Sequence, residues 1–256
     1  RVTKWSRGDS KYDVIYNLAC PAAPKAYQAD PLKTLTTCFV GTFNLLEIAQ
    51  QHGSVMVQAS TSEIYGDPKE HPQREDYNGN VNTCTPRACY DEGKRVAETI
   101  CYEFRNKGMD VRIARLFNTY GPKMRPDDGR VVSNFLKQAI LGEPLTVYGD
   151  GKQTRSFGYV SDTVRGLRML AEKDTWEHGP VNIGNSSEYT VEELAQVISE
   201  WFPKLMVISE PLPVADPCMR RPDLTLAKEK LGYEPIVTLR DGLRTTIEWM
   251  EKEVVR

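Results

Sequence analysis

Residues 54–63 read SVMVQASTSE, a short apolar run that ends abruptly in hydroxyl and acidic side chains. An apolar run of this length is typical of a strand that is buried within a parallel sheet. In open parallel sheets, ligands bind beyond the carboxyl ends of the strands. The stretch therefore predicts a core strand and, at Thr61, Ser62 and Glu63, one edge of a functional site.

The same pattern repeats on both sides of this strand. Apolar runs at residues 12–19 and 111–117 predict two further strands, and residues 31–51 and 88–108 show the apolar spacing of helices. Alternation of strands and helices is what a parallel sheet with crossover helices requires. We therefore predict an α/β protein with a Rossmann-like, doubly wound parallel sheet.

After Pro122 the pattern becomes less regular. We expect helices near 131–143, 190–202, 224–232 and 240–253, a further helix from Ser161 or Asp162, and short strands near 145–149, 155–160 and 181–184. Residues 1–122 are then the remaining part of a nucleotide-binding domain, and 123–256 form mostly a smaller, mixed substrate-binding lobe. Residues 158–185 are expected to return to the first domain.

Composition excludes several classes of partner. The 33 basic and 35 acidic side chains nearly cancel, so no broad positive field is available to hold a nucleic acid. No apolar run approaches the roughly 20 residues that cross a bilayer, so this chain shows no membrane contact. An anionic ligand must therefore be held by local groups.

Cysteines and histidines give no sign of a metal site. There are six cysteines without a C-x-x-C pair, namely Cys20, Cys38, Cys84, Cys89, Cys101 and Cys218. In a chain of this size they suit a reducing compartment, as free thiols that pack like small hydrophobes. The three histidines, His52, His71 and His178, lack metal-ligand spacing.

A tyrosine and a lysine stand four residues apart in the predicted helix, in RACYDEGKR at 87–95. At this spacing Tyr90 and Lys94 share a helix face, and a nearby ammonium would lower the phenol pKa and make it a usable base. The pair by itself is also compatible with an ordinary amphipathic helix. Likewise, Thr61 and Ser62 could merely cap the strand end, Asp91 could be a first-turn helix charge, and Asp162 is expected to cap a helix.

The motifs taken together resemble a known family. STSEIYGDP, RACYDEGKRVAE, RLFNTYGP, DDGRVVSNFLKQA, LTVYGDGKQTRSFGYVSD, VNIGN and RRPD occur in the order seen in extended short-chain dehydrogenases acting on nucleotide sugars. Among these, CYDEGKR together with NLACPAAP most resembles UDP-glucuronic acid decarboxylases, also called UDP-xylose synthases. One family motif, the G-x-x-G-x-x-G phosphate loop, does not precede Tyr12, so the chain resembles a member without its first βαβ segment.

The resemblance implies roles for particular residues. The implied catalytic residues are Tyr90, Lys94, Thr61, Glu63 and Arg220. The implied cofactor is NAD, held by Tyr90, Lys94, Ala19 and Ser60. The implied contacts to the sugar nucleotide are Ser62, Asn118, Lys137, Tyr148, Gln153, Arg155 and Arg220. No metal is implied.

The expected reaction is the NAD-dependent oxidative decarboxylation of UDP-glucuronate, through a UDP-4-keto intermediate, to UDP-xylose. Two alternatives stay open: a 4,6-dehydratase or epimerase of another nucleotide sugar, and an inactive sugar-nucleotide-binding fragment. The resemblance also implies a homodimer formed through the helices at 31–49 and 88–104. Cytoplasm is the expected location, with the secretory-pathway lumen as the alternative.

Overall fold

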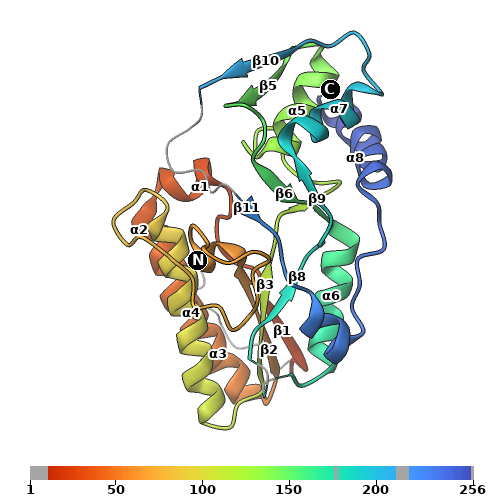
Figure 1. Ribbon diagram of the computed structural model, residues 1–256. Coiled ribbons are helices and arrows are strands. Elements are labelled where there is room, and N and C mark those ends of the chain that lie inside the picture. Colours follow the sequence, from red (N-terminus) through yellow and green to blue (C-terminus); the bar gives the residue numbers. More distant parts are fainter. Residues whose placement is uncertain (1–10, 176, 178, 212–218, 255–256) are drawn as a thin grey trace.

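A four-stranded parallel sheet forms the lower lobe of the molecule (Figure 1). In the order of the sheet, its strands are β1 (Val14–Asn17), β2 (Val55–Thr61), β3 (Val111–Leu116) and β8 (Val181–Ile183). The computed structural model describes residues 11–254 except 176, 178 and 212–218, so Cys218 and His178 lie outside the described residues. The predicted α/β class and parallel sheet are confirmed.

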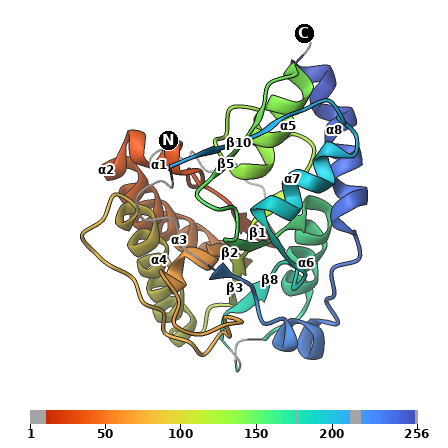
Figure 2. The ribbon, with the colours of Figure 1, turned by 45° about the horizontal axis from the view of Figure 1, so that its top comes forward.

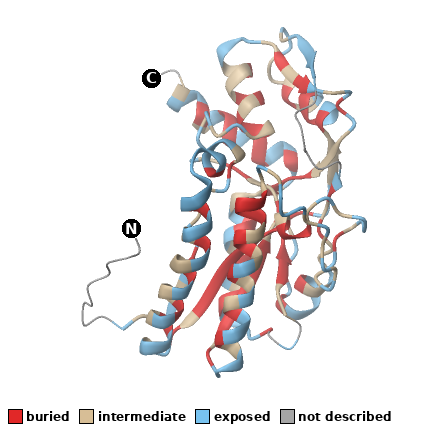
Figure 3. Cartoon of the chain, turned by 90° about the vertical axis from the view of Figure 1, so that its left-hand side faces the viewer, coloured by how far each residue is buried: buried red, intermediate tan, exposed pale blue. Residues whose placement is uncertain are grey.

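Helices cover both faces of this sheet. One face carries α2 (Pro31–Thr36), the π-helical turn η1 (Thr37–Gly41), α3 (Thr42–His52) and α4 (Ala88–Asn106). The other face carries α6 (Val160–Glu172) and η4 (Ala227–Leu231). Strands β2, β3 and β8 are almost wholly buried between the helices (Figure 3), whereas β1 exposes Val14 and Tyr16. Gly53 ends α3 in the left-handed conformation, as its position after the apolar stripe predicted.

The upper lobe packs three helices on a two-stranded sheet (Figure 2). Its elements are α5 (Val131–Leu141), β5 (Leu145–Tyr148), α7 (Val191–Ser199), β10 (Val207–Glu210) and α8 (Leu239–Val254). A second hydrophobic core lies between these helices. A capping box at Thr190 and Glu193 starts α7, because each side chain bonds the other residue's backbone N–H.

Short strands connect the two lobes. These strands are β4 (Thr119–Tyr120), β6 (Thr154–Ser156), β7 (Gly158–Tyr159), β9 (Glu188–Thr190) and β11 (Met219–Arg220). Strand β6 lies between β11 and β9, and Arg155 is the register partner of Arg220. This pairing brings two arginines from distant parts of the sequence to one place.

Some segments depart from the predicted elements. The structure has a short helix α1 (Pro24–Ala29) where the sequence suggested a loop; a proline at its first position suits a helix start. Residues 158–185 supply α6 and β8 to the lower lobe, but η4 also packs there, together with Tyr233, rather than on the second lobe. The division into domains at residue 122 stays a prediction.

The expected helix cap at Asp162 is wrong. Helix α6 begins at Val160, which places Asp162 inside the first turn, where it is 1% exposed. One carboxylate oxygen accepts hydrogen bonds from the backbone N–H groups of Ile236 and Val237, both at 3.0 Å. Asp162 therefore fastens a distant loop to α6, a contact that local sequence does not reveal.

The five described cysteines are free thiols. The sequence predicted that they would pack in the interior like small hydrophobic side chains, and three of the five do so. Cys38, Cys89 and Cys101 are buried, but Cys84 is exposed and Cys20 is half-buried. Among the described residues, no helix is long and apolar enough to cross a membrane.

Candidate active site

The carboxyl end of β2 sets out three polar side chains in sequence. The Thr61 side chain accepts a hydrogen bond from the backbone N–H of Glu63 at 3.2 Å and starts the 3-10 turn η2 (Ser62–Tyr65). Thr61 and Ser62 are 7% and 2% exposed. Thr61 thus performs the capping role that the sequence allowed, and the turn directs Glu63 across the edge of the sheet.

Glu63 lies between two arginines. It accepts hydrogen bonds from Arg87 and forms an ion pair with Nη1 of Arg220 at 2.9 Å. Burial would raise the pKa of Glu63, but the charges of Arg220 and Arg87 outweigh it and hold the pKa below the ordinary value of 4.5. Glu63 is therefore an ionised hydrogen-bond acceptor at neutral pH, which suits the orientation of a sugar hydroxyl.

Arg220 reaches this position from near the C-terminus and is 2% exposed. Its Nη1 donates to Ser62 Oγ at 3.2 Å, and its Nη2 donates to the Gly66 carbonyl at 2.9 Å. The Arg155 charge next to it also lowers the pKa of Glu63. Two arginines, Arg87 and Arg220, therefore pair with one carboxylate, an arrangement that suits an anionic ligand.

Tyr90 and Lys94 lie one turn apart on α4, as their spacing predicted, and are 5% and 4% exposed. The Lys94 ammonium lies 5.9 Å from the centre of the Tyr90 ring and donates a hydrogen bond to the Ala59 carbonyl at 2.8 Å. This bond ties α4 to β2 just before Thr61. The lysine is thus held at the sheet edge beside the tyrosine.

The predicted lowering of the Tyr90 pKa by Lys94 is not what the described residues show. Burial has the largest effect and raises the pKa of Tyr90 above its ordinary value of 10. A hydrogen bond between the Thr61 and Tyr90 side chains is the largest influence in the opposite direction. The ammonium is directed to the Ala59 carbonyl, so Thr61 is the group that assists ionisation of this phenol.

Tyr27 is a site residue that sequence reasoning missed. Its ring stacks on Tyr90, with centroids 5.0 Å apart and planes 8° from parallel. It is 1% exposed, and its hydroxyl has no hydrogen-bond partner. A proline start for α1 was the available signal, because it predicts that Tyr27 lies on a helix beside the end of β1. Arg87 was likewise not assigned to the site.

Asp91 follows Tyr90 on α4 and is buried, at 5% exposed, rather than lying on the helix surface. Its Oδ1 atom has no hydrogen-bond partner. Burial raises the pKa of Asp91 to about 7, and the negative charge of Glu63 adds to the effect. Asp91 therefore changes protonation state near neutral pH.

We call Tyr27, Glu63, Arg87, Asp91 and Arg220 the strand-end cluster. Among the described residues, four buried side-chain atoms lack a hydrogen-bond partner, and three of them, the Tyr27 hydroxyl, Asp91 Oδ1 and Arg220 Nε, belong to this cluster. Buried polar atoms in folded proteins are normally paired. The cluster therefore has the chemistry to bind a polar, hydroxyl-rich ligand.

Two residues expected to hold a cofactor lie at neighbouring strand ends. Ala19 is exposed just after β1, and its backbone N–H donates to Asn17 Oδ1 at 3.2 Å. Ser60 precedes Thr61 on β2, but its hydroxyl donates to Glu98 at 2.5 Å. Ala19 and Lys94 thus lie at the sheet edge where ligands bind, whereas the Ser60 side chain already has a protein partner.

The remaining predicted substrate residues are dispersed. Asn118 follows β3 and accepts a hydrogen bond from Gly158 N–H at 2.8 Å through its carbonyl. Lys137 is half-buried on α5, and Gln153 donates to the carbonyl of the exposed Tyr148 at 2.9 Å. Among the described residues, no hydrogen bond joins this group to the strand-end cluster, and no set of three side chains is arranged to hold a metal.

Residues 8–246 match the family model described as GDP-mannose 4,6 dehydratase, which is more than half of the chain. The chain belongs to this family. Membership of the GDP-mannose 4,6 dehydratase family confirms the predicted resemblance to nucleotide-sugar enzymes of the extended short-chain dehydrogenase type. The motifs that carried the resemblance, from STSE to RRPD, all lie within the matched residues.

Similar proteins include UDP-glucuronic acid decarboxylase 1 from Arabidopsis thaliana, 54% identical over 90% of this chain and 53% of that protein. The chain thus spans about half the length of this relative. Solved structures with the same fold include UDP-glucose 4-epimerase from Thermotoga maritima, with a TM-score of 0.86 and 30% identity over 94% of this chain and 78% of that one. UDP-glucuronic acid 4-epimerase from Bacillus cereus, in complex with UDP-glucuronic acid and NAD, has a TM-score of 0.83 and 27% identity over 94% and 76%.

Proposed function

We propose that this protein catalyses the NAD-dependent oxidative decarboxylation of UDP-glucuronate to UDP-xylose. The observation that carries the proposal is the pair of arginines at the end of β2, Arg87 and Arg220, which both pair with the single carboxylate of Glu63. A sugar that bears a carboxylate suits such a site better than a neutral sugar does. The similarity to the Arabidopsis thaliana decarboxylase supports the same choice.

NAD is the proposed cofactor, and Tyr90, Lys94 and Ala19 are the residues proposed to hold it, since the Ser60 hydroxyl is committed to Glu98. Support comes from the similar Bacillus cereus structure, which contains NAD together with UDP-glucuronic acid. Lys94 has two ammonium hydrogens beyond the one given to Ala59, so it can donate to a ribose hydroxyl. When bound, NAD supplies the acceptor and donor of hydride at C4 of the sugar.

In the proposed reaction, Tyr90 takes the proton from the sugar 4-hydroxyl while Thr61 hydrogen-bonds the same oxygen. Oxidation at C4 turns the hexuronate into a β-keto acid. The bond from C5 to the carboxylate then breaks, carbon dioxide leaves, and the electron pair passes to the 4-keto group as an enolate. A proton added at C5 completes the decarboxylation, and Tyr90 returns its proton to the 4-oxygen as C4 is reduced, which gives UDP-xylose. Tyr90 can accept the first proton only as the phenolate, and the Thr61 side chain favours that form against the burial that raises the Tyr90 pKa.

The other residues are proposed to hold the sugar nucleotide. Glu63, fixed as a carboxylate, accepts a sugar hydroxyl, and Arg220 holds the sugar near Ser62 and assists the decarboxylation step. A guanidinium fork such as that of Arg155 suits diphosphate oxygens. The remaining proposed contacts to the diphosphate and base are Asn118, Lys137, Tyr148 and Gln153.

Incubation of the protein with UDP-glucuronate and NAD tests the proposal, with carbon dioxide and a UDP-pentose measured by mass spectrometry. UDP-glucose in a parallel reaction is the neutral control. We expect release of carbon dioxide and formation of UDP-xylose from UDP-glucuronate only. Preferred turnover of UDP-glucose would instead support an epimerase or dehydratase, and release of a UDP-4-keto pentose would correct the proposed product.

A second copy of the chain is the proposed partner. Large apolar side chains lie exposed on the outer face of α2, η1, α3 and α4, namely Leu32, Leu35, Phe39, Phe43, Val96 and Tyr102. Between η1 and α4 this face contains a groove of about 300 Å³ lined by Leu35, Phe39, Val40 and Val96. Exposed apolar surface of this extent marks an interaction site. Cytoplasm stays the proposed location, in agreement with the free thiols.

A further inference from the structure

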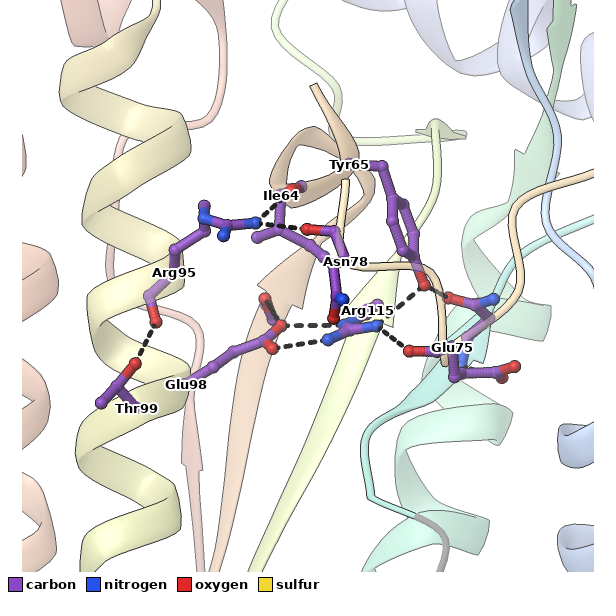
Figure 4. Close-up of polar contacts among 10 residues, drawn as sticks. Ile64, Tyr65, Glu75, Asn78, Arg95, Glu98, Thr99 and Arg115 are labelled. Atoms are coloured by element: carbon purple, nitrogen blue, oxygen red, sulfur yellow. Dashed lines mark hydrogen bonds and ion pairs between the residues drawn. The ribbon is translucent and has the colours of Figure 1, made fainter. Parts of the chain in front are cut away.

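A second polar network joins Glu98, Arg115 and Tyr65 (Figure 4). Its centre is Glu98 on α4, which accepts hydrogen bonds from Arg115 Nε at 3.1 Å and Nη2 at 2.9 Å. The same carboxylate accepts the Ser60 hydroxyl at 2.5 Å. Ser60 and Arg115 are 4% and 9% exposed, and the Glu98 side chain is 14% exposed, so α4, β2 and β3 are joined through one partly buried carboxylate.

The network extends across the sheet. Arg115 Nη1 donates to the Tyr65 hydroxyl at 3.0 Å and to the Glu75 carbonyl at 2.7 Å. The Tyr65 hydroxyl in turn donates to Asn182 Oδ1 on β8 at 2.9 Å. We call Ser60, Tyr65, Glu98, Arg115 and Asn182 the interior network. None of its polar side-chain atoms is among the buried atoms without a partner.

Two successive residues of β2 are bonded to α4. Lys94 donates to the Ala59 carbonyl, and Glu98 accepts the Ser60 hydroxyl. Tyr90, Lys94 and Glu98 are spaced four residues apart, so they lie along one face of α4. A shift of α4 along β2 would break both contacts and move Tyr90 relative to Thr61.

We propose that Ser60 and Glu98 are positioning residues, which set the contact between Tyr90 and Thr61 by fixing α4 against β2, while Arg115 holds Glu98 in place. The inference rests on the proposed function, in which Tyr90 is the base. It gives the Ser60 hydroxyl a role distinct from cofactor binding, because that hydroxyl is committed to Glu98. Misplacement of a reacting group by about 1 Å can lower a rate by about 10²-fold, so small shifts of α4 have measurable effects.

The test compares three variants of the protein: Ser60→Ala, Glu98→Gln and the control Thr99→Ala. Ser60→Ala removes one hydrogen bond and leaves Glu98 paired with Arg115. Glu98→Gln keeps the shape of the side chain and an oxygen that can accept the Ser60 hydroxyl. It removes the negative charge and so weakens the pairing with Arg115. Thr99 is exposed on the same helix and bonds only the Arg95 carbonyl within α4 (Figure 4).

We expect Ser60→Ala to lower kcat for UDP-glucuronate about tenfold with KM within about twofold, and Glu98→Gln to lower kcat by a similar factor. The acid limb of the kcat–pH profile moves to higher pH in both, because the Thr61 hydrogen bond that lowers the Tyr90 pKa is weakened. Thr99→Ala changes neither quantity. Thermal unfolding of each variant reports whether it is folded.

The outcomes separate this inference from the proposed function. A parent protein without turnover of UDP-glucuronate overturns both. An active parent, together with folded Ser60→Ala and Glu98→Gln variants that keep its kcat and pH profile, overturns the positioning role alone. A rise in KM without a change in kcat or pH profile also overturns it, since that result assigns Ser60 to ligand binding.

Discussion

The strand-end cluster and the interior network are adjacent, and both are built from buried arginines and carboxylates, yet they differ in completeness. In the interior network every buried polar side-chain atom has a partner, whereas the strand-end cluster contains three buried atoms that have none. A network whose buried polar atoms are all hydrogen-bonded rigidifies a core. Buried polar atoms without a hydrogen-bond partner cost free energy, and a ligand that bonds them can offset this cost. The difference indicates that the interior network serves the fold and that the strand-end cluster serves binding and chemistry.

Loss of the Tyr90 hydroxyl should have the largest effect. We expect Tyr90→Phe to lower turnover of UDP-glucuronate by about 10²- to 10⁴-fold, because a general base contributes about that much. The affinity for UDP, measured by calorimetry, should stay unchanged. Tyr102→Phe, on the exposed face of the same helix, is the matched control. Near-normal turnover of Tyr90→Phe would remove the catalytic assignment.

Breaking the interior network should instead reduce stability. Glu98→Ala leaves the Arg115 charge buried without its carboxylate, which typically costs about 3–5 kcal/mol. Urea denaturation measures the free energy of unfolding, and Thr99→Ala should stay within about 0.5 kcal/mol of the parent. A Glu98→Ala variant as stable as the control would show that the interior network does not serve the fold.

The stability contributed by the strand-end cluster should depend on pH, because its member Asp91 has a raised pKa. Its pKa is raised to about 7 in the folded chain from 3.8, so between these values the folded state binds more protons than the unfolded state. Stability contributed by Asp91 is therefore present at low pH and lost as pH rises toward 7. The free energy of unfolding of Asp91→Asn, relative to that of the parent, should therefore increase by on the order of 3 kcal/mol as the pH rises from 4 to 8. Urea denaturation measures both free energies of unfolding. A difference between variant and parent that stays the same across this pH range would contradict the prediction.

A charge on the outer helical face should leave both networks intact and have the smallest effect on folding. Phe39→Glu places a carboxylate in the apolar groove between η1 and α4, and Phe39 is already 51% exposed. Light scattering should report half the parent's mass, while the free energy of unfolding of the monomer changes by about 0.5 kcal/mol or less. A parent that is itself monomeric would overturn the proposed homodimer.

Local sequence patterns predicted the parts of the site that depend on local geometry. The strand before Thr61 and the shared face of Tyr90 and Lys94 follow from apolar spacing and helix periodicity. Arg220 reaches Glu63 across 157 positions of the chain, and only the family resemblance connected the two.

Other features depend on tertiary contacts that no local pattern encodes. Tyr27 stacks on Tyr90 from a different helix, and Lys94 bonds the Ala59 carbonyl of a neighbouring strand. Asp91 lies in the first turn of α4, as the sequence allowed, but its burial depends on tertiary contacts. In each case the identity of the partner, rather than the type of element, was missing from the sequence reasoning.

A crystal structure of the Tyr90→Phe variant with UDP-glucuronate tests the central claim most directly, because this variant consumes the substrate only slowly. We predict that the glucuronate ring lies in the strand-end cluster, with its 4-hydroxyl about 3 Å from Thr61 Oγ and beside Phe at position 90. Arg220 and the Tyr27 hydroxyl should then contact the sugar. A sugar bound elsewhere, with the Tyr27 hydroxyl, Asp91 Oδ1 and Arg220 Nε still unpaired, would contradict the assignment of the active site.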